Sequence, residues 1–352
     1  MDGISWSCPG CRGELEPGEG RWSCRGCGAG YRAVRGIPDL RTGDDLYMPN
    51  GDDWAIAREL DAGFDRLDFR GLLDLYFDLA PGITPESKRR QLTHILTAPG
   101  RARGWVEGLG SVGRGTVLDL GCGSGSFLAA AGREFAAAGG VDIAMRWLLV
   151  ARKRLDEAGL GHIPLACACA ENLPLRGACV AGVVAGDVFE HVADQGATLA
   201  EAHRVLRAGG TLFLASPNRY SLAPEPHVGV WGVGFLPRRW MPAYVRMASG
   251  ADFRAIRTLG YAEWVRTLSV SPFGGGRVTA PPLPGDDLAH FGPARRAMAR
   301  VYNEVAATAA GRLAARSVGP LFHVVCEKRP ATPTPTPTRA TRRRSTPSAT
   351  PG

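Results

Sequence analysis

Two kinds of segment are missing from this 352-residue sequence, and each absence excludes a class of protein. No apolar run approaches the ~20 residues that a membrane-spanning helix needs. The N-terminus, MDGISWSCPG, has neither the basic region nor the apolar stretch of a secretory signal. With 45% hydrophobic and 22% charged residues, the composition is that of a folded globular chain. We therefore expect a cytoplasmic protein without a membrane span.

Disulfides and a strongly basic folded body are also not expected. Four of the nine cysteines form a cluster near the N-terminus, and the other five are scattered, an odd number in a chain expected to be cytoplasmic. The net charge is +8, but residues 330–352 hold four arginines and no acid, which leaves +4 for the rest of the chain. A dedicated nucleic-acid binder usually concentrates more charge. Nucleic acid is therefore a disfavoured partner.

Composition and pattern divide the chain into four regions. Residues 1–42 hold the cysteine cluster, and residues 43–110 are expected to be helical because apolar residues recur there at helical spacing. Residues 111–329 alternate strand and helix patterns. Residues 330–352 are rich in Pro and Thr, so we expect a disordered basic tail.

The third region has the pattern of a doubly wound α/β fold. Strands that alternate with helices form a parallel sheet with helices on both faces. A segment rich in Pro and Gly, residues 217–240, predicts a long ordered loop of the kind that lines active sites. We expect strands at 116–120, 139–143, near 163–170, 179–186, 211–216, 275–283 and 321–328, and helices at 126–139, 144–159, 197–210, 260–268 and 294–316.

The segment VLDLGCGSGSF (117–127) predicts a strand that passes into a helix through a ligand-binding loop. Dinucleotide oxidoreductases and S-adenosylmethionine (SAM) methyltransferases both begin in this way. A dinucleotide loop needs G-x-G-x-x-G, but here the glycines are Gly121, Gly123 and Gly125, which gives G-x-G-x-G. Asp119 at the strand tip would repel a pyrophosphate, whereas a carboxylate near the ammonium of SAM is favourable. The spacing therefore favours SAM.

An acid also ends the second expected strand. Asp142, in GGVDIA, can accept hydrogen bonds from both ribose hydroxyls of a nucleoside. This position indicates a nucleoside ligand without separating SAM from a nicotinamide cofactor. The segment CAENLPL (169–175) follows the third strand, where the chain can pass the adenine edge, and GDVFEHV (186–192) follows the fourth.

Together these segments resemble the class I SAM-dependent methyltransferases, above all the group that includes the ubiquinone and menaquinone biosynthetic enzymes. The resemblance implies a Rossmann-like, mostly parallel sheet of seven strands whose last strand is antiparallel. Cys169 departs from it, because the family usually has an Asp there that bonds the adenine amino group, and a thiol is a poor acceptor. The implied contacts are Gly121, Cys122, Gly123 and Gly125 for the methionine part, Asp119 for its ammonium, Asp142 with Ile143 for the ribose, Ala170 and Glu171 for the adenine, and Asp187 and His191 for the wall facing the methyl group.

Two C-x2-C pairs, CPGC and CRGC, predict a closed structural zinc site. The thiolates of Cys8, Cys11, Cys24 and Cys27 would surround one Zn(II), with Pro9, Gly10 and Gly26 helping the turns. Because so small a segment can bury little apolar core, the metal would supply its folding energy. We expect the core of the sheet domain to be separate from this segment. A pair of redox disulfides is the alternative.

The cysteine segment also resembles the zinc-ribbon activator proteins that partner tRNA and rRNA methyltransferases, and the ribbons fused ahead of bacterial methyltransferase domains. The resemblance lies in the passage from the second cysteine pair through Tyr31 to a Gly-Ile-Pro turn at 36–38. A protein partner that binds through the ribbon is therefore an alternative to RNA. Arginines and glutamates balance in the ribbon, which disfavours an RNA surface.

The sequence defines the methyl acceptor less well. No Asn/Asp-Pro-Pro-aromatic stretch follows the fourth strand, and no cysteine lies in that loop, which disfavours methylation of base amines and of pyrimidine C5. A hydroxyl acceptor needs one base, for which His191 is the first candidate and His227 the second. Trp231, Phe235 and Trp240 could form an apolar acceptor pocket, and core packing is equally expected of them.

We therefore expect O- or N-methyl transfer to a small-molecule, lipid or glycan-type acceptor. The first alternative is an rRNA or tRNA methyltransferase that uses the ribbon to contact RNA. The second is a non-catalytic module that binds SAM or scaffolds a partner.

Overall fold

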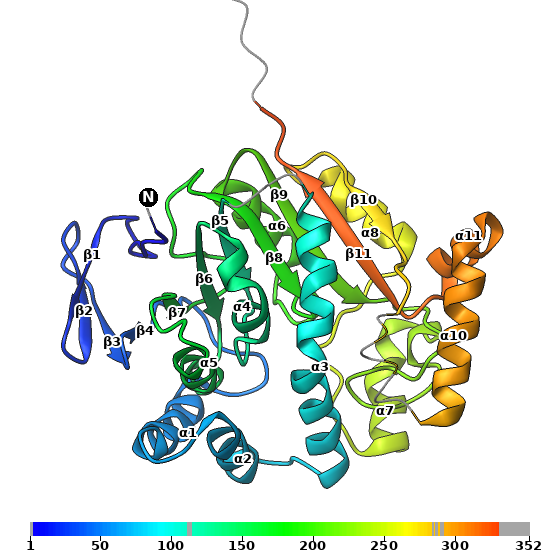
Figure 1. Cartoon of the computed structure of the whole chain (residues 1–352), viewed down its shortest axis with the longest axis horizontal. Coiled ribbons are helices and arrows are strands. Elements are labelled where there is room, and N and C mark those ends of the chain that lie inside the picture. The colour runs from blue at the N-terminus through cyan, green and yellow to red at the C-terminus, as the bar shows by residue number, and fades with distance from the viewer. Residues whose placement is uncertain (1–2, 111–114, 284, 286–287, 289–291, 331–352) are drawn as a thin grey trace, which may run out of the picture.

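A seven-stranded sheet with helices on both faces forms the centre of the molecule, and a four-stranded sheet lies at one of its edges (Figure 1). The computed structural model describes residues 3–110, 115–283, 285, 288 and 292–330. The tail expected to be disordered lies, beyond residue 330, outside the described residues. In the part that is described, we find no helix with the length and apolar character needed to cross a bilayer.

The large sheet has the strand order β10-β11-β9-β8-β5-β6-β7. Only β11 runs antiparallel to its neighbours, β9 and β10, while the other pairings are parallel. The predicted fold class and the antiparallel last strand are thus confirmed. The order reverses between β5 and β8, the kind of switch point where α/β sheets bind ligands. The strands are β5 (Thr116–Leu120), β6 (Ala137–Asp142), β7 (Leu165–Cys167), β8 (Val180–Gly186), β9 (Leu206–Pro217), β10 (Arg277–Thr279) and β11 (Leu321–Glu327).

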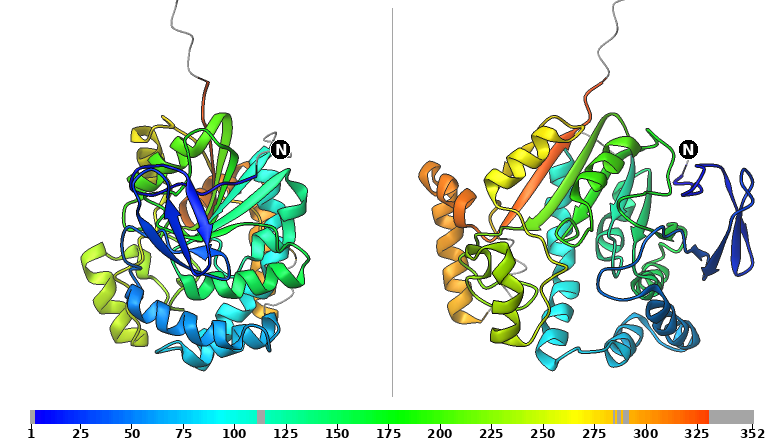
Figure 2. Two further views of the ribbon diagram at one scale, coloured as in Figure 1. Left: turned by 90° about the vertical axis from the view of Figure 1, so that its left-hand side faces the viewer. Right: turned by 180° about the vertical axis from the view of Figure 1, so that it is seen from behind.

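Helices cover the two faces of this sheet separately, as the front and back views show (Figures 1 and 2). One face carries α3 (Pro85–Leu109), α4 (Ser126–Ala131) and α5 (Met145–Glu157). The other carries α6 (Gln195–Val205) and α8 (Tyr261–Val270). Each face has its own cluster of buried apolar side chains.

Three expected helices have different bounds in the structure. The helix expected at 197–210 ends at Val205, and β9 begins at Leu206. The helix expected at 126–139 ends at Ala131, and after a short 3-10 turn Ala137 begins β6. Alanine is the best helix former, but intrinsic propensity is a weak preference, and pairing of this segment between β5 and β7 overrides it here. The helix expected at 294–316 is two helices, α10 (Pro293–Ala307) and α11 (Ala309–Val318), because the Thr308 side chain caps α11 by accepting from the amide of Gly311.

Three helices precede the large sheet, as predicted for residues 43–110. They are α1 (Asn50–Gly63), α2 (Phe69–Leu79) and α3. Thr84 caps α3 by accepting a hydrogen bond of 3.1 Å from the amide of Ser87. The first two helices pack on α5, where the rings of Tyr76 and Trp147 lie 4.2 Å apart. The helical segment therefore covers the beginning of α5, beside the carboxyl end of β6.

The cysteine-bearing segment folds as a small antiparallel sheet against the β7 edge (Figure 1). Its strands are β1 (Leu15–Gly18), β2 (Arg21–Cys24), β3 (Gly30–Val34) and β4 (Ile37–Pro38). The amide of Leu40 donates to the carbonyl of Cys167 at 2.7 Å, and the amide of Ser7 donates to the carbonyl of Pro174 at 2.8 Å. These bonds join the segment to the large sheet.

The expectation of a separate core for this segment is wrong. Trp6, Leu15 and Leu40 are buried, and they belong to the same apolar cluster as Leu118 and Val141 of the large sheet. The reason is the docking itself, because a segment of this size gains most of its apolar burial from its neighbour rather than from its own residues.

Candidate functional site

A large cleft opens at the carboxyl ends of β5, β6 and β8, at the switch point of the sheet. Its volume is about 1840 Å³, whereas pockets for one small ligand are typically about 300–1,000 Å³. Its walls include segment 42–47, helix α3, the loop after β5 and residues 217–229 of the long loop. The cleft therefore has room for a cofactor and a second molecule.

The loop after β5 has the geometry that its glycines predict. Gly121, Gly123 and Gly125 all have positive φ, between 48° and 70°. A Cβ atom on Gly121 would lie 2.1 Å from Val188, so no side chain fits there. A Cβ atom on Gly123 would meet nothing within 4 Å, so this backbone faces open space in the cleft. The loop thus presents bare main chain to a ligand.

Asp119 is a buried carboxylate without a hydrogen-bond partner for its Oδ2 atom among the described residues. Burial, and then the charge of Asp142, raise the pKa of Asp119 to about 8. An unpartnered buried carboxylate is costly unless a ligand compensates it. Asp119 lines the cleft, so the position fits the cationic group predicted for it.

Asp142 connects the glycine loop to the start of α5. Its Oδ2 atom accepts from the amide of Gly123 at 2.8 Å, and its Oδ1 atom accepts from the amide of Ala144 at 2.9 Å. Burial raises the pKa of Asp142 to about 6, against these two amide bonds. Each carboxylate oxygen can accept a second hydrogen bond, so ribose hydroxyls could still bind.

The other residues expected around a nucleoside also line the cleft, but their side chains have different surroundings. The buried thiol of Cys122 lies beside Gly140 in the sheet, so only its backbone is available to a ligand. The carbonyl of Ile143 accepts from Arg41, and Ala170 lines the cleft beside Glu171. The carboxylate of Glu171 accepts from the amide of Ala193 at 2.7 Å, which fixes the loop after β8.

A second polar cluster lies in the same cleft. The rings of His191 and His227 are 4.6 Å apart, so the structure brings the two candidate bases together. Glu190, which is buried, places its Oε1 atom 3.7 Å from Nε2 of His227 and 4.0 Å from Nε2 of His191. Donor atoms of these three residues lie within 4.8 Å of one another, a geometry that could also hold a metal ion.

The two histidines have different electrostatic surroundings. Burial, and then the neighbouring His227, lower the pKa of His191 to about 3. Burial also lowers the pKa of His227, but Glu225 and Glu190 outweigh it and raise that pKa above its ordinary value. Nδ1 of His227 donates to Oε1 of Glu225 at 2.6 Å, which orients the ring. His227 is therefore the more basic of the two rings.

Three partners of these histidines were missed from the sequence. Glu190 directly precedes His191, and Glu225 lies two residues before His227, so both were visible as neighbouring acids. The hydroxyl of Tyr47 contacts Nδ1 of His191 across 144 positions of sequence, and no local pattern indicates such a contact.

Two further predictions concern the wall of the cleft. Asp187 lines the cleft, and its backbone has a positive φ. Its Oδ2 atom lies 3.5 Å from Nε2 of His94 on α3. Trp231, Phe235 and Trp240 are 60%, 48% and 54% exposed and lie outside the cleft lining. They form neither a pocket wall nor core, because the long loop packs instead through its valines on α7 (Met241–Ser249).

The four cysteines of the N-terminal segment converge as predicted. Their Sγ atoms lie within 4.8 Å of one another, with 3.7 Å between Cys8 and Cys27 and 3.4 Å between Cys11 and Cys24. Tetrahedral Zn–S bonds of about 2.3 Å place sulfurs at about this separation. The donor set therefore fits one zinc ion.

Pro9, Gly10 and Gly26 lie in the turns of the two cysteine pairs, as predicted. Positive φ falls after each pair, at Arg12 and Gly28, rather than at Gly10 or Gly26. Arg12 tolerates this conformation because its guanidinium binds the carbonyl of Leu173 and the side chain of Asn172 in the large domain.

Comparison with known proteins adds to this geometry. The family model described as "Methyltransferase domain" matches residues 118–214. A ubiquinone biosynthesis O-methyltransferase of Paracidovorax citrulli is 32% identical over 121 residues, which are 34% of this chain and 51% of that protein. The ubiquinone/menaquinone biosynthesis C-methyltransferase UbiE of Acidiphilium cryptum is 38% identical over 128 residues, 35% of this chain and 50% of that protein.

The chain thus spans about half the length of these relatives. Among solved structures, the geranyl diphosphate C-methyltransferase of Streptomyces coelicolor A3(2) is similar with a TM-score of 0.43 and 16% identity. That similarity covers 65% of this chain and 75% of the other, and it is too low to bear on function.

Proposed function

Because residues 118–214 form a class I SAM-dependent methyltransferase domain, we propose that the whole chain transfers the methyl group of SAM to an oxygen or nitrogen of a small acceptor. The acceptor is a small molecule, a lipid or a glycan-type compound. The single observation that carries the SAM assignment is Asp119, buried and unpartnered at the tip of β5, beside bare glycine backbone. The size of the cleft supports a second molecule beside the cofactor.

The chain's own residues bind and orient the cofactor. Asp119 would face its ammonium, the backbone at 121–125 its methionine part, and Asp142 with the backbone of Ile143 its ribose. Ala170 and Glu171 would flank the adenine from the loop after β7. When bound, SAM supplies an electrophilic methyl group, whose transfer needs alignment more than acid–base help.

For a hydroxyl acceptor, His227 would take the proton. Its Nδ1–H donates to Glu225, which leaves Nε2 free to accept, and Glu225 stabilises the positive charge that forms. His191 stays neutral because burial disfavours its protonated form, so it would position the acceptor rather than titrate.

We also propose that Cys8, Cys11, Cys24 and Cys27 hold one structural Zn(II). A metal-binding cluster and five scattered cysteines are the cysteine usage of a reducing compartment, so we propose the cytoplasm as the location.

The RNA methyltransferase alternative has little support at the ribbon. Arg12 is turned into the large domain, and Arg25 pairs with Glu16 at 3.2 Å. A protein partner at the ribbon stays a proposal of lower rank, since one face of the ribbon is already used in docking to β7.

Calorimetry with SAM, S-adenosylhomocysteine (SAH) and NAD tests the cofactor. We expect binding of SAM and SAH and none of NAD. Binding of NAD without a response to SAM or SAH would overturn the assignment. Screening acceptor classes with labelled SAM then separates small molecules from RNA, because transfer to RNA alone would contradict the proposed acceptor.

A further inference from the structure

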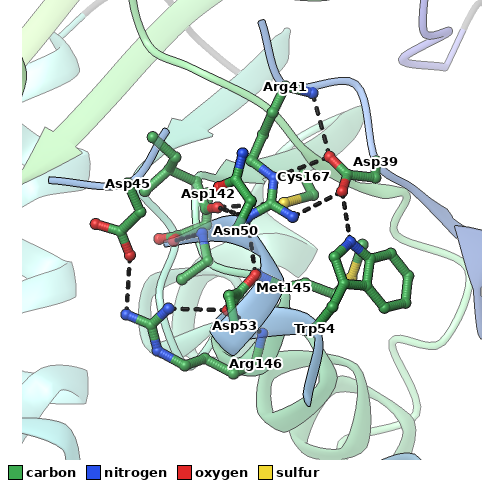
Figure 3. Close-up of polar contacts among 12 residues, drawn as sticks. Asp39, Arg41, Asp45, Asn50, Asp53, Trp54, Asp142, Met145, Arg146 and Cys167 are labelled. Carbon is green, nitrogen blue, oxygen red and sulfur yellow. Dashed lines mark hydrogen bonds and ion pairs between the residues drawn. The ribbon is translucent and has the colours of Figure 1, made fainter. Parts of the chain in front are cut away.

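A buried polar network joins the N-terminal ribbon, helix α1 and the start of α5, directly behind Asp142 (Figure 3). Its centre is Asp53, in the first turn of α1, whose side chain is 0% exposed. Asp53 lies 2.8 Å from Nη1 of Arg41 and 2.8 Å from Nη1 of Arg146. None of these residues was singled out by the sequence.

Asp53 also caps the N-terminus of helix α5, whose own sequence supplies no capping side chain. The N-cap position of α5 is Ala144, which offers no side-chain acceptor to the free amides of the first turn. Asp53 accepts from the amide of Met145 at 3.0 Å and from the amide of Arg146 at 3.2 Å. The cap of α5 therefore comes from another helix, 92 positions earlier in the chain.

This external cap bears on Asp142, which is two residues before Ala144. An aspartate at that point of a strand-to-helix turn can itself satisfy first-turn amides. Since Asp53 occupies the amides of Met145 and Arg146, Asp142 holds only the amide of Ala144 and keeps its other oxygen on Gly123. Asp142 thus stays turned toward the cleft.

The same network anchors one wall of the cleft. Residues 42–47 line this wall, and the network holds the segment at two points. Directly before the segment, Arg41 binds Asp53 and the carbonyl of Ile143, the latter at 3.1 Å. Within the segment, Oδ2 of Asp45 lies 3.0 Å from Arg146.

We propose that Asp53 is a positioning residue of the cofactor site, which holds Asp142, Ile143 and segment 42–47 in the arrangement that receives the SAM nucleoside. The proposal rests on the proposed function, since it concerns the same site. It makes the contact between the ribbon, the helical segment and the sheet a part of cofactor binding. A merely structural Asp53 would affect stability and leave affinity unchanged.

Calorimetric titration of the full-length protein with SAH tests this role, with Asp53→Asn as the variant. The substitution keeps the volume and removes the charge that faces Arg41 and Arg146. We expect SAH to bind about tenfold more weakly, within the usual range for coupled sites. In the free protein, the amides of Met145 and Arg146 should exchange with solvent faster than in the wild type, because their acceptor is weakened.

The matched control is Asp61→Asn on the same helix. Asp61 lies 2.6 Å from Arg35 of the ribbon but is 37% exposed, and among the described residues its carboxylate has no ion pair with α5. Its SAH affinity should stay within about twofold of the wild type, since exposed pairs contribute little. Equal SAH affinity of Asp53→Asn and the wild type would overturn the proposal.

A second variant covers a failure of Asp53→Asn to fold. Arg41→Lys keeps the charge but loses the forked contacts to Asp39, Asp53 and Ile143, and it should also weaken SAH binding. An unchanged affinity there would equally overturn the proposal. A wild-type protein that does not bind SAH would instead contradict the proposed function, so the two failures are distinguishable.

Discussion

The Oδ2 atom of Asp142 accepts a hydrogen bond of 2.8 Å from the amide of Gly123, which ties the acid at the end of β6 to the glycine loop after β5. We expect Asp142→Ala to weaken SAH binding at least tenfold. The variant would lose the ribose hydrogen bonds, about 1.5–3 kcal/mol each as an upper range, and would also free the loop. Calorimetry measures the loss. The control is Asp156→Ala. Asp156 lies on α5, the helix after Asp142, and it pairs with Arg152 outside the cleft. Unchanged affinity of the first variant would mean that Asp142 is not the ribose acid.

The affinity for SAH should rise with pH. Burial and the charge of Asp142 raise the pKa of Asp119 to about 8, so below that pH the free protein carries the neutral carboxyl. Binding the ligand's ammonium requires the charged form, so a proton must leave on binding. We expect affinity to increase from about pH 6 to about pH 8, by at most about tenfold per unit. Titrations in buffers of different ionisation enthalpy detect the released proton.

The matched variant for this pH dependence is Asp119→Asn, which cannot ionise. Its affinity should be lower than that of the wild type and nearly independent of pH over the same range, apart from the weaker contribution of Asp142. A flat profile in the wild type would show that Asp119 is not the partner of the ammonium.

Local patterns predicted much of the fold and of the cofactor site. The glycine loop, Asp119, Asp142 and the cysteine pairs depend on residues close in sequence, and the structure places them in one cleft and one sulfur cluster as expected. Hydrophobic periodicity predicted the strands of the large sheet for the same reason.

The rest depends on contacts that no local pattern records. Asp53 caps a helix 92 positions away, and Tyr47 reaches His191 across 144 positions. Leu40 is buried only because the ribbon docks on β7, which is why a separate core was wrongly expected. Trp231 is exposed because its loop packs on α7 through valines instead.

His227 should matter more for turnover than His191. With an acceptor found by screening, His227→Gln should lower kcat about 100-fold or more while SAH affinity stays unchanged, because general-base catalysis contributes on that order. Since the pKa of His227 is raised above its ordinary value, wild-type kcat should increase as pH rises through that pKa. Glu225→Gln should shift this rise to lower pH, because the carboxylate that favours the protonated ring is gone. A larger loss in His191→Gln than in His227→Gln would contradict this order.

Deletion of residues 331–352 should leave thermal stability and SAH affinity unchanged. This segment has no apolar face to dock, and its prolines disfavour regular structure. Its four arginines are the densest basic cluster in the sequence, so any affinity for nucleic acid should fall on deletion and should decrease steeply with salt. Loss of methyl transfer to a small acceptor at ordinary salt would show that the segment belongs to the active machinery.

Metal analysis of the purified protein should find one zinc per chain. Removal of the zinc by a chelator should destabilise the large domain as well as the ribbon. The four sulfurs lie within 4.8 Å of one another, and like charges at this distance repel strongly without a cation.

Sequence reasoning alone predicts that Cys24→Ser unfolds the first 40 residues and leaves the sheet intact. The buried contacts of Trp6 and Leu40 with the large sheet change this prediction, because unfolding the ribbon exposes that shared core. We expect Cys24→Ser to lower the melting temperature of the whole protein by several degrees, which differential scanning calorimetry measures. Cys179→Ser, an exposed thiol outside the ribbon, is the control and should not change it. A protein without zinc, whose four thiols react freely in the folded state, would contradict the metal site. A Cys24→Ser variant with an unchanged melting temperature would contradict the coupling of the two cores.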